Sequence, residues 1–560
     1  MIVPTFARRP IVGYSWIVLA AVGTGFLSFG LWVHHMFTTG LPGISLGLFS
    51  AASEAVAIPT GVQIFCFLAT LAAGRLVRSV PMLYAFGSLV IFVLGGLTGV
   101  MVAIAPFDFQ AHDTFFVVAH FHYVLIGGAL FPIFAGCYYF FPLINGKKLS
   151  DRLGKIAFWF AFIGFNVAFL PMHLTGLRGM PRRVFTYPAD LGFDALNLTS
   201  SVGAFILATG VAIVFWDLVR PKGKQPYSER NPWDAGTLEW VQEMPGKPWG
   251  IRSIPEIDSR YPLWDQPNIL RDIDEGRFYL PDAEEGKRET LVTSTIDAQP
   301  IQCLRVPGPS FIPPIAALTT GGFFIFGTFY WWWMALASLV VALGVISYWL
   351  WTGTAIIPEK EEKDVSLGLR LPLYVSGPSS VSWWAMFITM LAVLTAFVCL
   401  VFGYFFFWTI HEDFPPAPST GPGVFWPLIA AVLLLGAWAL TLLARRWNRH
   451  DRSVGFYVGL LLAAALAVAG GAALLAGPWL TGLDPKSHVY PAMVWLLVIW
   501  TAGHAVVGLI MQLYCVARRL AGRMTARYDI DISNVALYWH FTALTVVITV
   551  AVIAGFPLVA

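Results

Sequence analysis

The stretch FFVVAHFHYVLIGGALFPIFAGCYYFFP, residues 115–142, decides the fold class of this chain. It is almost wholly apolar or aromatic, yet it holds two histidines, His120 and His122. An α-helix needs about 20 apolar residues to cross the hydrocarbon core of a bilayer. Ionisable residues within such spans are rare and mostly functional. The stretch therefore predicts a transmembrane helix that carries part of a functional site.

The composition extends this prediction to the whole chain. Hydrophobic residues make up 57% and charged residues 12% of the sequence, with a mean hydropathy of +0.69, whereas a soluble protein carries about twice that charged fraction. The net charge of +3 is too small to indicate a nucleic-acid partner. Apolar runs recur near residues 11–34, 51–73, 81–105, 114–142, 155–176, 196–219, 310–330, 333–353, 383–409, 423–444, 454–479, 489–517 and 536–557. The sequence thus predicts an all-α polytopic membrane protein with about 13 transmembrane helices.

Charge in the connecting segments predicts the orientation, because Lys and Arg concentrate in cytoplasmic loops. The basic residues that we expect inside lie in alternate connections: Arg8, Arg9, Arg75, Arg78, Lys147, Lys148, Arg152 and Lys155. The connections 36–50 and 106–113 lack Lys and Arg and are expected outside. The long polar segment 220–308 is then a cytoplasmic linker with little regular structure, which joins two helical bundles.

One connection breaks this pattern. Residues 177–195 should lie outside, yet they include Arg178, Arg182 and Arg183. Guanidinium groups pair well with carboxylates, so a ligand with carboxylate groups near the outer surface would account for these arginines. Binding to lipid headgroups is the alternative interpretation.

The spacing of the histidines indicates metal chemistry. On an α-helix, His120 and His122 point about 200° apart and can serve two groups on opposite sides, as axial ligands of two haems do. His34 and His35 diverge by only about 100° and lie near a predicted helix end, so both can reach one metal, for which copper is suitable. Polar contacts between helices are the simpler alternative for all four histidines.

Five ordered motifs over residues 1 to about 265 resemble subunit I of haem-copper cytochrome c oxidases. The motifs are WVHHMF at 32–37, IPTG at 58–61, HDTFFVVAHFHYVL at 112–125, GMPRR at 179–183 and NPWDAGTLEW at 231–240. They match the second half of that family. The resemblance implies two haems, of haem A type, together with copper and magnesium.

The resemblance also implies a role for each matched residue. His120 would be the proximal ligand of the high-spin haem at the oxygen site, and His122 would ligate the low-spin haem. His34 and His35 would be two of the three histidines on the copper. The remaining roles fall to His112 and Asp113 as magnesium ligands, and to Arg182, Arg183 and Asp108 as partners of the haem propionates.

Thr60 and Gln63 fall on a proton path of the family. Family members usually carry a lysine at the position of Gln63, and a glutamine can order water but cannot carry charge. The path is therefore in doubt at this residue, while Thr60 is retained.

The remainder of the chain is similar to subunit III of the same enzymes. GHAVVG at 503–508 and YWHF at 538–541 carry this resemblance, with seven predicted spans. We therefore expect residues 1–219 to be the C-terminal half of subunit I, 220–308 the linker with the subunit I tail, and 309–560 a subunit III-like module. Subunit III holds no redox centre, so His504 and His540 are expected to make polar helix contacts.

The resemblance implies a part of a bacterial plasma-membrane oxidase that transfers electrons from cytochrome c to oxygen, gives water and drives proton translocation. The first half of subunit I is not matched, so we expect another chain to supply the missing ligands. Subunit II, with its copper centre, is a further expected partner. The alternatives are an inactive truncated fragment without haem and a quinol-oxidising relative.

Overall fold

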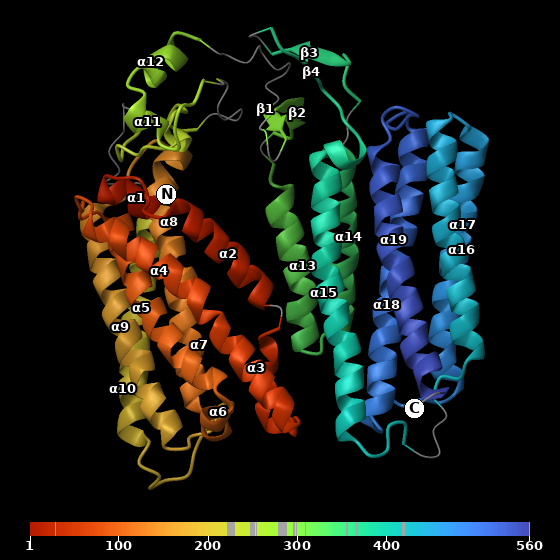
Figure 1. Ribbon diagram of the computed structural model, residues 1–560, viewed down its shortest axis with the longest axis horizontal. Coiled ribbons are helices and arrows are strands. Elements are labelled where there is room, and N and C mark those ends of the chain that lie inside the picture. Colours follow the sequence, from red (N-terminus) through yellow and green to blue (C-terminus); the bar gives the residue numbers. More distant parts are fainter. Residues whose placement is uncertain are drawn as a thin grey trace. The chain divides into compact units, whose positions relative to one another are not determined.

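The computed structural model describes residues 1–28, 30–220, 230–246, 253, 255–277, 288–294, 297, 299–308, 310–353, 357–365, 368–416 and 421–558. The chain forms two compact units, Met1–Tyr279 and Leu280–Ala560. Their boundary falls within the predicted linker. Figure 1 colours the helices of the first unit red to yellow-green and those of the second green to blue.

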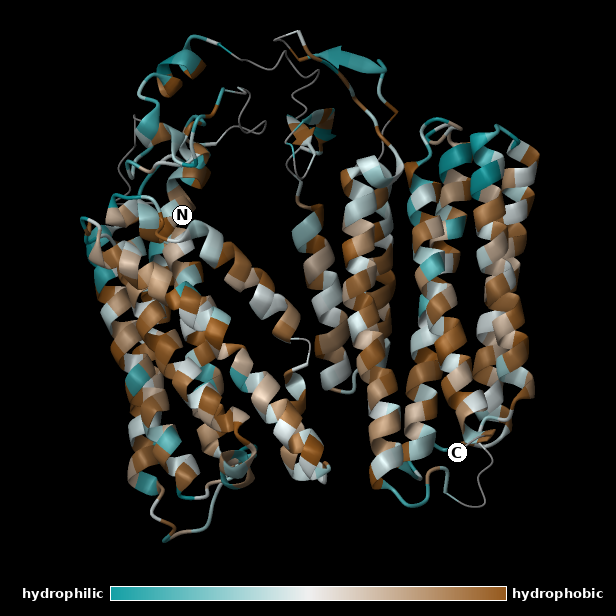
Figure 2. Cartoon of the chain, in the orientation of Figure 1, coloured by the Kyte–Doolittle hydropathy of each residue, from teal (hydrophilic) through white to brown (hydrophobic). Residues whose placement is uncertain are grey.

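The prediction of an all-α polytopic membrane protein is confirmed. Within the described residues, twelve helices are long and apolar enough to cross a membrane. The remaining predicted span, near residues 310–330, is the shorter apolar helix α13, Ile312–Thr328, of 17 residues. Figure 2 shows apolar residues along the shafts of the helices and hydrophilic residues gathered mainly at their ends. This distribution is the one that a bilayer requires.

The first unit is a helical bundle followed by short helical turns. Its elements are α1 Ile2–Ala7, α2 Tyr14–Ser28, η1 Trp32–Thr39, α3 Gly43–Ala55, α4 Ala57–Ala72, α5 Val80–Ala103, α6 Ala105–Ala111, α7 Phe115–Leu125, η2 Ile126–Leu130, α8 Phe131–Asn145, α9 Asp151–Leu177, α10 Asp194–Val219, η3 Leu238–Trp240, α11 Pro262–Asp265 and α12 Ile269–Asp274. Side-chain caps fix several starts, because Ser79, Thr114 and Ser150 accept hydrogen bonds from the first turns of α5, α7 and α9.

Three sequence predictions were wrong in this unit, one helix end and two loops. The first long helix ends at Ser28, and His34 and His35 lie on a separate 3₁₀ helix, η1. The segments 36–50 and 106–113, predicted as loops, are mostly helical, since they include most of α3 and all but the first residue of α6. α3 and α4 adjoin at Val56. Pro59, in the first turn of α4, has no N–H to continue the helical ladder there.

Close helix packing places α10 against α9. A Cβ atom on Gly203 would lie 2.2 Å from the backbone nitrogen of Ala168, and one on Gly164 would lie 2.3 Å from that of Leu207. Small residues therefore let the two backbones approach directly, as membrane helices commonly do.

The second unit holds the remaining spans and two strand pairs. Its elements are β1 Arg288–Thr293, β2 Pro300–Val306, α13 Ile312–Thr328, α14 Trp332–Gly353, β3 Glu362–Asp364, β4 Arg370–Pro372, η5 Gly377–Ser379, α15 Val381–Ile410, α16 Phe425–Arg449, α17 Ser453–Leu480, α18 Val489–Leu520, α19 Ile530–Val550, η6 Ala551–Gly555 and η7 Phe556–Leu558. The buried residues Phe397, Tyr404, Tyr490 and Leu497 belong to its largest apolar core.

The β1–β2 pair gives the predicted linker, residues 220–308, more regular structure than expected, whereas β3 and β4 lie beyond it. β1 pairs antiparallel with β2, with Leu291 opposite Cys303, and β3 pairs with β4. β1 contains Thr290, Val292 and Thr293, and such β-branched residues favour strands.

Candidate functional site

His120 is held by α5. Its Nδ1 lies 2.9 Å from the carbonyl oxygen of Gly95 and 3.2 Å from Oγ1 of Thr98. A Cβ atom on Gly99 would lie 2.8 Å from Cε1 of His120, so the glycine makes room for the ring. Donation from Nδ1 to the carbonyl leaves the lone pair of Nε2 available for a metal, which is the common arrangement of ligating histidines.

His122 faces a different neighbour. Its Nδ1 lies 2.7 Å from the carbonyl oxygen of Val118, one turn earlier in α7. Its ring stacks on Phe169 of α9, with ring centroids 4.3 Å apart and an interplanar angle of 14°. His120 thus turns to α5 and His122 to α9, as their spacing predicts. One helix presents an available Nε2 on each of two sides.

His34 and His35 converge even though they lie on a 3₁₀ helix. Their Nε2 atoms are 3.1 Å apart, and Nδ1 of His34 lies 3.1 Å from Oγ of Ser53 in α3. Two imidazole nitrogens that bind one metal at about 2.0–2.1 Å each lie roughly 3 Å apart. The pair therefore fits a shared metal ion. His120 is close enough to interact electrostatically with His34.

The segment after α9 crosses the start of α7 and pairs with it. The backbone nitrogen of Phe115 donates to Met180 O at 3.0 Å, and that of Arg182 donates to Asp113 O at 2.8 Å. The Asp113 carboxylate lies 3.8 Å from Nε of Arg182 and 3.4 Å from Nη1 of Arg183. Two of the three arginines that broke the loop-charge pattern, Arg182 and Arg183, thus have a carboxylate partner within the chain.

His112 lies between two carboxylates. Its Nδ1 is 3.5 Å from Oδ2 of Asp108, and its Nε2 is 3.9 Å from Oδ2 of Asp113. Burial raises the pKa of Asp108 to about 6, against the opposing effect of His112. The structure therefore brings together all five residues that the resemblance assigned to magnesium and the propionates.

Two buried atoms in this cluster lack hydrogen-bond partners, namely Oδ2 of Asp108 and Nε of Arg182. Buried polar atoms are normally paired. A propionate beside Arg182 would supply the missing acceptor for its Nε. Among the described residues, no group of three or more His, Cys, Asp and Glu side chains is arranged to hold a metal. The copper and magnesium assignments therefore each rest on two protein ligands.

Thr60 and Gln63 both lie on α4. Nε2 of Gln63 donates to Oγ1 of Thr24 in α2 at 3.4 Å, and Oγ1 of Thr60 donates to the carbonyl oxygen of Val56 at 2.9 Å. Both side chains are neutral, and Gln63 joins two helices.

Sequence reasoning missed the groups that orient the histidines. Gly95, Thr98 and Gly99 contact His120, and Ser53 contacts His34. The glycines of the GGLTG stretch at 95–99 were the available signal, because glycines in a membrane helix indicate close approach.

The His540 side chain makes a polar contact between helices, as expected, whereas Nδ1 of His504 lies 2.9 Å from the carbonyl oxygen of Trp500 within α18. Tyr538 of α19 donates its hydroxyl to the carbonyl oxygen of His504 at 3.1 Å. Nε1 of Trp438 in α16 donates to Nδ1 of His540 in α19 at 3.1 Å. The bond to His540 joins α16 to α19 through the histidine side chain, and the bond from Tyr538 joins α19 to the backbone of α18.

Comparison with known proteins matches the part of the chain that carries the site. Residues 1–206 match the family model described as Cytochrome C and Quinol oxidase polypeptide I. Residues 1–206 are therefore similar to subunit I of haem-copper oxidases. Cytochrome c oxidase subunit 1 of Bacillus subtilis is 45% identical over 264 residues, which cover 47% of this chain and 42% of that protein.

Two further relatives have the same name. The protein of Synechocystis is 46% identical over 248 residues, covering 44% of each chain. That of Bacillus sp. PS3 is 40% identical over 314 residues, covering 56% of this chain and 48% of its own. The chain thus spans about half the length of these relatives. The similarity of residues 309–560 to subunit III stays a prediction.

Proposed function

We propose that the chain is part of a haem-copper terminal oxidase of the bacterial plasma membrane, which transfers electrons from cytochrome c to oxygen, gives water and drives proton translocation. The observation that carries the proposal is the arrangement on α7. His120 and His122 face opposite sides, and each has its Nδ1 beside a backbone carbonyl oxygen. This arrangement suits two separate iron centres held by one helix.

The residues of the chain would hold the cofactors as follows. His120 would bind the haem iron at the oxygen site, His122 the low-spin haem, and His34 with His35 the copper. When bound, haems of the A type and copper supply the redox chemistry, while the protein positions them and tunes their potentials.

The Gly95 carbonyl keeps the Nδ1 proton of His120 in place, which preserves the basicity of Nε2. Ser53 contacts Nδ1 of His34 at 3.1 Å and so orients that ring. Arg182 and Arg183 offset negative charge at the outer ends of the helices, and His112 with Asp113 would hold magnesium there through further water ligands.

Further protein must complete these centres. A low-spin haem has two axial ligands, and copper on two imidazoles is under-ligated. We propose that the family's other half of subunit I supplies the additional ligands, and that subunit II with its copper centre brings electrons from cytochrome c. Proton delivery would pass Thr60, with Gln63 ordering water in place of a charged group.

The test is the replacement of His120 in the complex purified from native membranes. His120→Ala should abolish the haem that reacts with carbon monoxide and leave the low-spin spectrum. His173→Ala is the matched control, because its ring also packs on α7, against Phe116 and Tyr123, but has no assigned ligand role. Retention of the carbon monoxide spectrum in His120→Ala would exclude the proposed ligation.

A further inference from the structure

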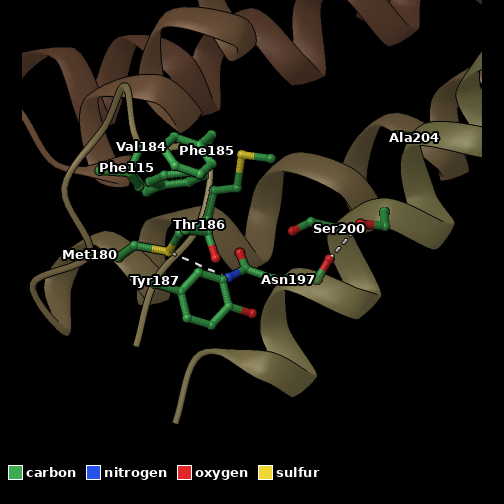
Figure 3. A pocket seen from close by; sticks show the side chains of 11 residues that line it. Phe115, Met180, Val184, Phe185, Thr186, Tyr187, Asn197, Ser200 and Ala204 are labelled. Atoms are coloured by element: carbon green, nitrogen blue, oxygen red, sulfur yellow. Dashed lines mark hydrogen bonds between the residues drawn. The ribbon is translucent and has the colours of Figure 1, made fainter. Parts of the chain in front are cut away.

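A cavity of about 290 Å³ lies where the segment after α9 passes over the start of α10 (Figure 3). Phe115 of α7, Met172 of α9 and Val184 contribute apolar walls, and Asn197 and Ser200 of α10 contribute polar groups. All of its lining residues are described by the structure, and none of them is charged. Its size approaches that of sites for small ligands, about 300–1,000 Å³. A neutral ligand with an apolar part fits this lining.

Ser200 is the lining residue whose buried hydroxyl lacks a hydrogen-bond partner. The residue is 5% exposed, and its Oγ has no hydrogen-bond partner. Its neighbours are satisfied, because the hydroxyls of Thr199 and Ser201 donate to carbonyl oxygens one turn earlier at 2.8 and 2.9 Å. A buried hydroxyl without a partner is costly. An acceptor at Ser200 would remove that cost.

A track of small residues leads from the cavity along α10, toward the C-terminal end of the helix. Ser201, Ala204, Ala208 and Ala212 lie on one face of the helix by their spacing of three to four residues, and all four are exposed. Phe205, 77% exposed, stands beside them. Alanines beside a large side chain leave a shallow apolar path along a helix that is apolar enough to span the membrane. The polar groups lie at the N-terminal end of α10, and the apolar path lies further along the helix toward its C-terminal end.

We propose that the cavity and this track bind one membrane lipid with an ester-linked acyl chain. The hydroxyl of Ser200 donates to an ester carbonyl, and the acyl chain lies over Ala204, Ala208 and Ala212. The uncharged lining matches the ester region of a lipid rather than its phosphate. Ester groups lie at the boundary of the hydrocarbon core, which is the level of a helix end. The lipid also supports the segment that carries Met180 and Val184, since both line the cavity.

The test uses the full chain, purified from native membranes and returned to phosphatidylcholine vesicles. The vesicles contain a phosphatidylcholine with a photoreactive group in one acyl chain, in an ester-linked or an ether-linked form. Labelled positions are read by mass spectrometry. The ester lipid should label residues 204–212 several-fold more than residues 428–436 of α16, which include the exposed Leu428 and Val432.

Ser200→Val should lower labelling of residues 204–212 by about two- to tenfold, the range that one net hydrogen bond accounts for. Thr199→Val is the matched control, because it removes an exposed hydroxyl one residue away and should leave labelling unchanged. The ether lipid, which lacks the carbonyl, should label the unaltered chain as weakly as the ester lipid labels Ser200→Val.

Equal labelling of residues 204–212 and 428–436 would show only general lipid contact and would overturn the proposal. So would equal labelling by the ester and ether lipids in the unaltered chain, a comparison that does not depend on how well any variant folds. Neither result bears on the haem assignment, because no readout here involves a haem.

Discussion

Replacement of Gly99 by alanine should disturb His120 without touching the imidazole itself. The added Cβ would lie 2.8 Å from Cε1 of His120, whereas carbon atoms in contact prefer about 3.5–4.0 Å. The ring must therefore move by roughly 0.7 Å or more. A shift of that size takes Nδ1 from 2.9 Å to about 3.6 Å from Gly95 O, beyond hydrogen-bond range.

The loss should cost about 0.5–1.5 kcal/mol, the net contribution of one hydrogen bond, because the Gly95 carbonyl keeps its bond from the Thr98 hydroxyl. Comparable disruption beside metal-bound histidines lowers metal affinity about 10–100-fold. The assay is the carbon monoxide difference spectrum of the purified complex, with haem content measured in parallel. Gly99→Ala should lose most of the carbon monoxide signal and keep the low-spin haem.

Gly96→Ala is the matched control, since no atom lies within 4 Å of the position of its added Cβ. Both changes gain the same helix propensity, about 1 kcal/mol, so the difference between them isolates the contact with His120. Equal spectra for the two variants would refute the reasoning that α5 positions this histidine.

Gly203→Leu should lower the midpoint of thermal unfolding well below that of Gly96→Leu, because its side chain would collide with the backbone of α9; equal midpoints would contradict the close packing. Replacing Arg182 and Arg183 together by glutamine should shift the haem redox potentials or impair assembly, and unchanged redox titrations would remove the propionate assignment. Burial raises the pKa of the Cys303 thiol to about 11, which lowers the fraction of reactive thiolate at pH 8. Alkylation of Cys303 at pH 8 should therefore be roughly a hundredfold slower in the folded chain than in urea. A rate that levels off near pH 8.5 in the folded chain would show that the thiol is not buried.

The sequence was sufficient to predict the helices and the opposite directions of His120 and His122. Both depend on short-range properties, namely apolar run length and helical period. The strands β1 and β2 were missed because a short polar hairpin has a weak pattern beside strongly apolar helices. The early end of α2 at Ser28 was also missed, since the residues after it remain apolar.

The contacts of the site could not be predicted from spacing. Gly99 is 21 residues from His120, and Ser53 is 19 residues from His34. These contacts depend on how separate helices pack. The pairing of Asp113 with Arg182 and Arg183 likewise depends on the segment after α9 crossing the start of α7.

The haem content of the native complex decides whether this chain holds haem within an oxidase. The chain would be tagged at its C-terminus in its own gene, captured from native membranes and analysed for haem and polypeptides. We expect two haems per chain, one reactive with carbon monoxide, together with additional membrane-embedded protein. A captured chain without haem would contradict this expectation.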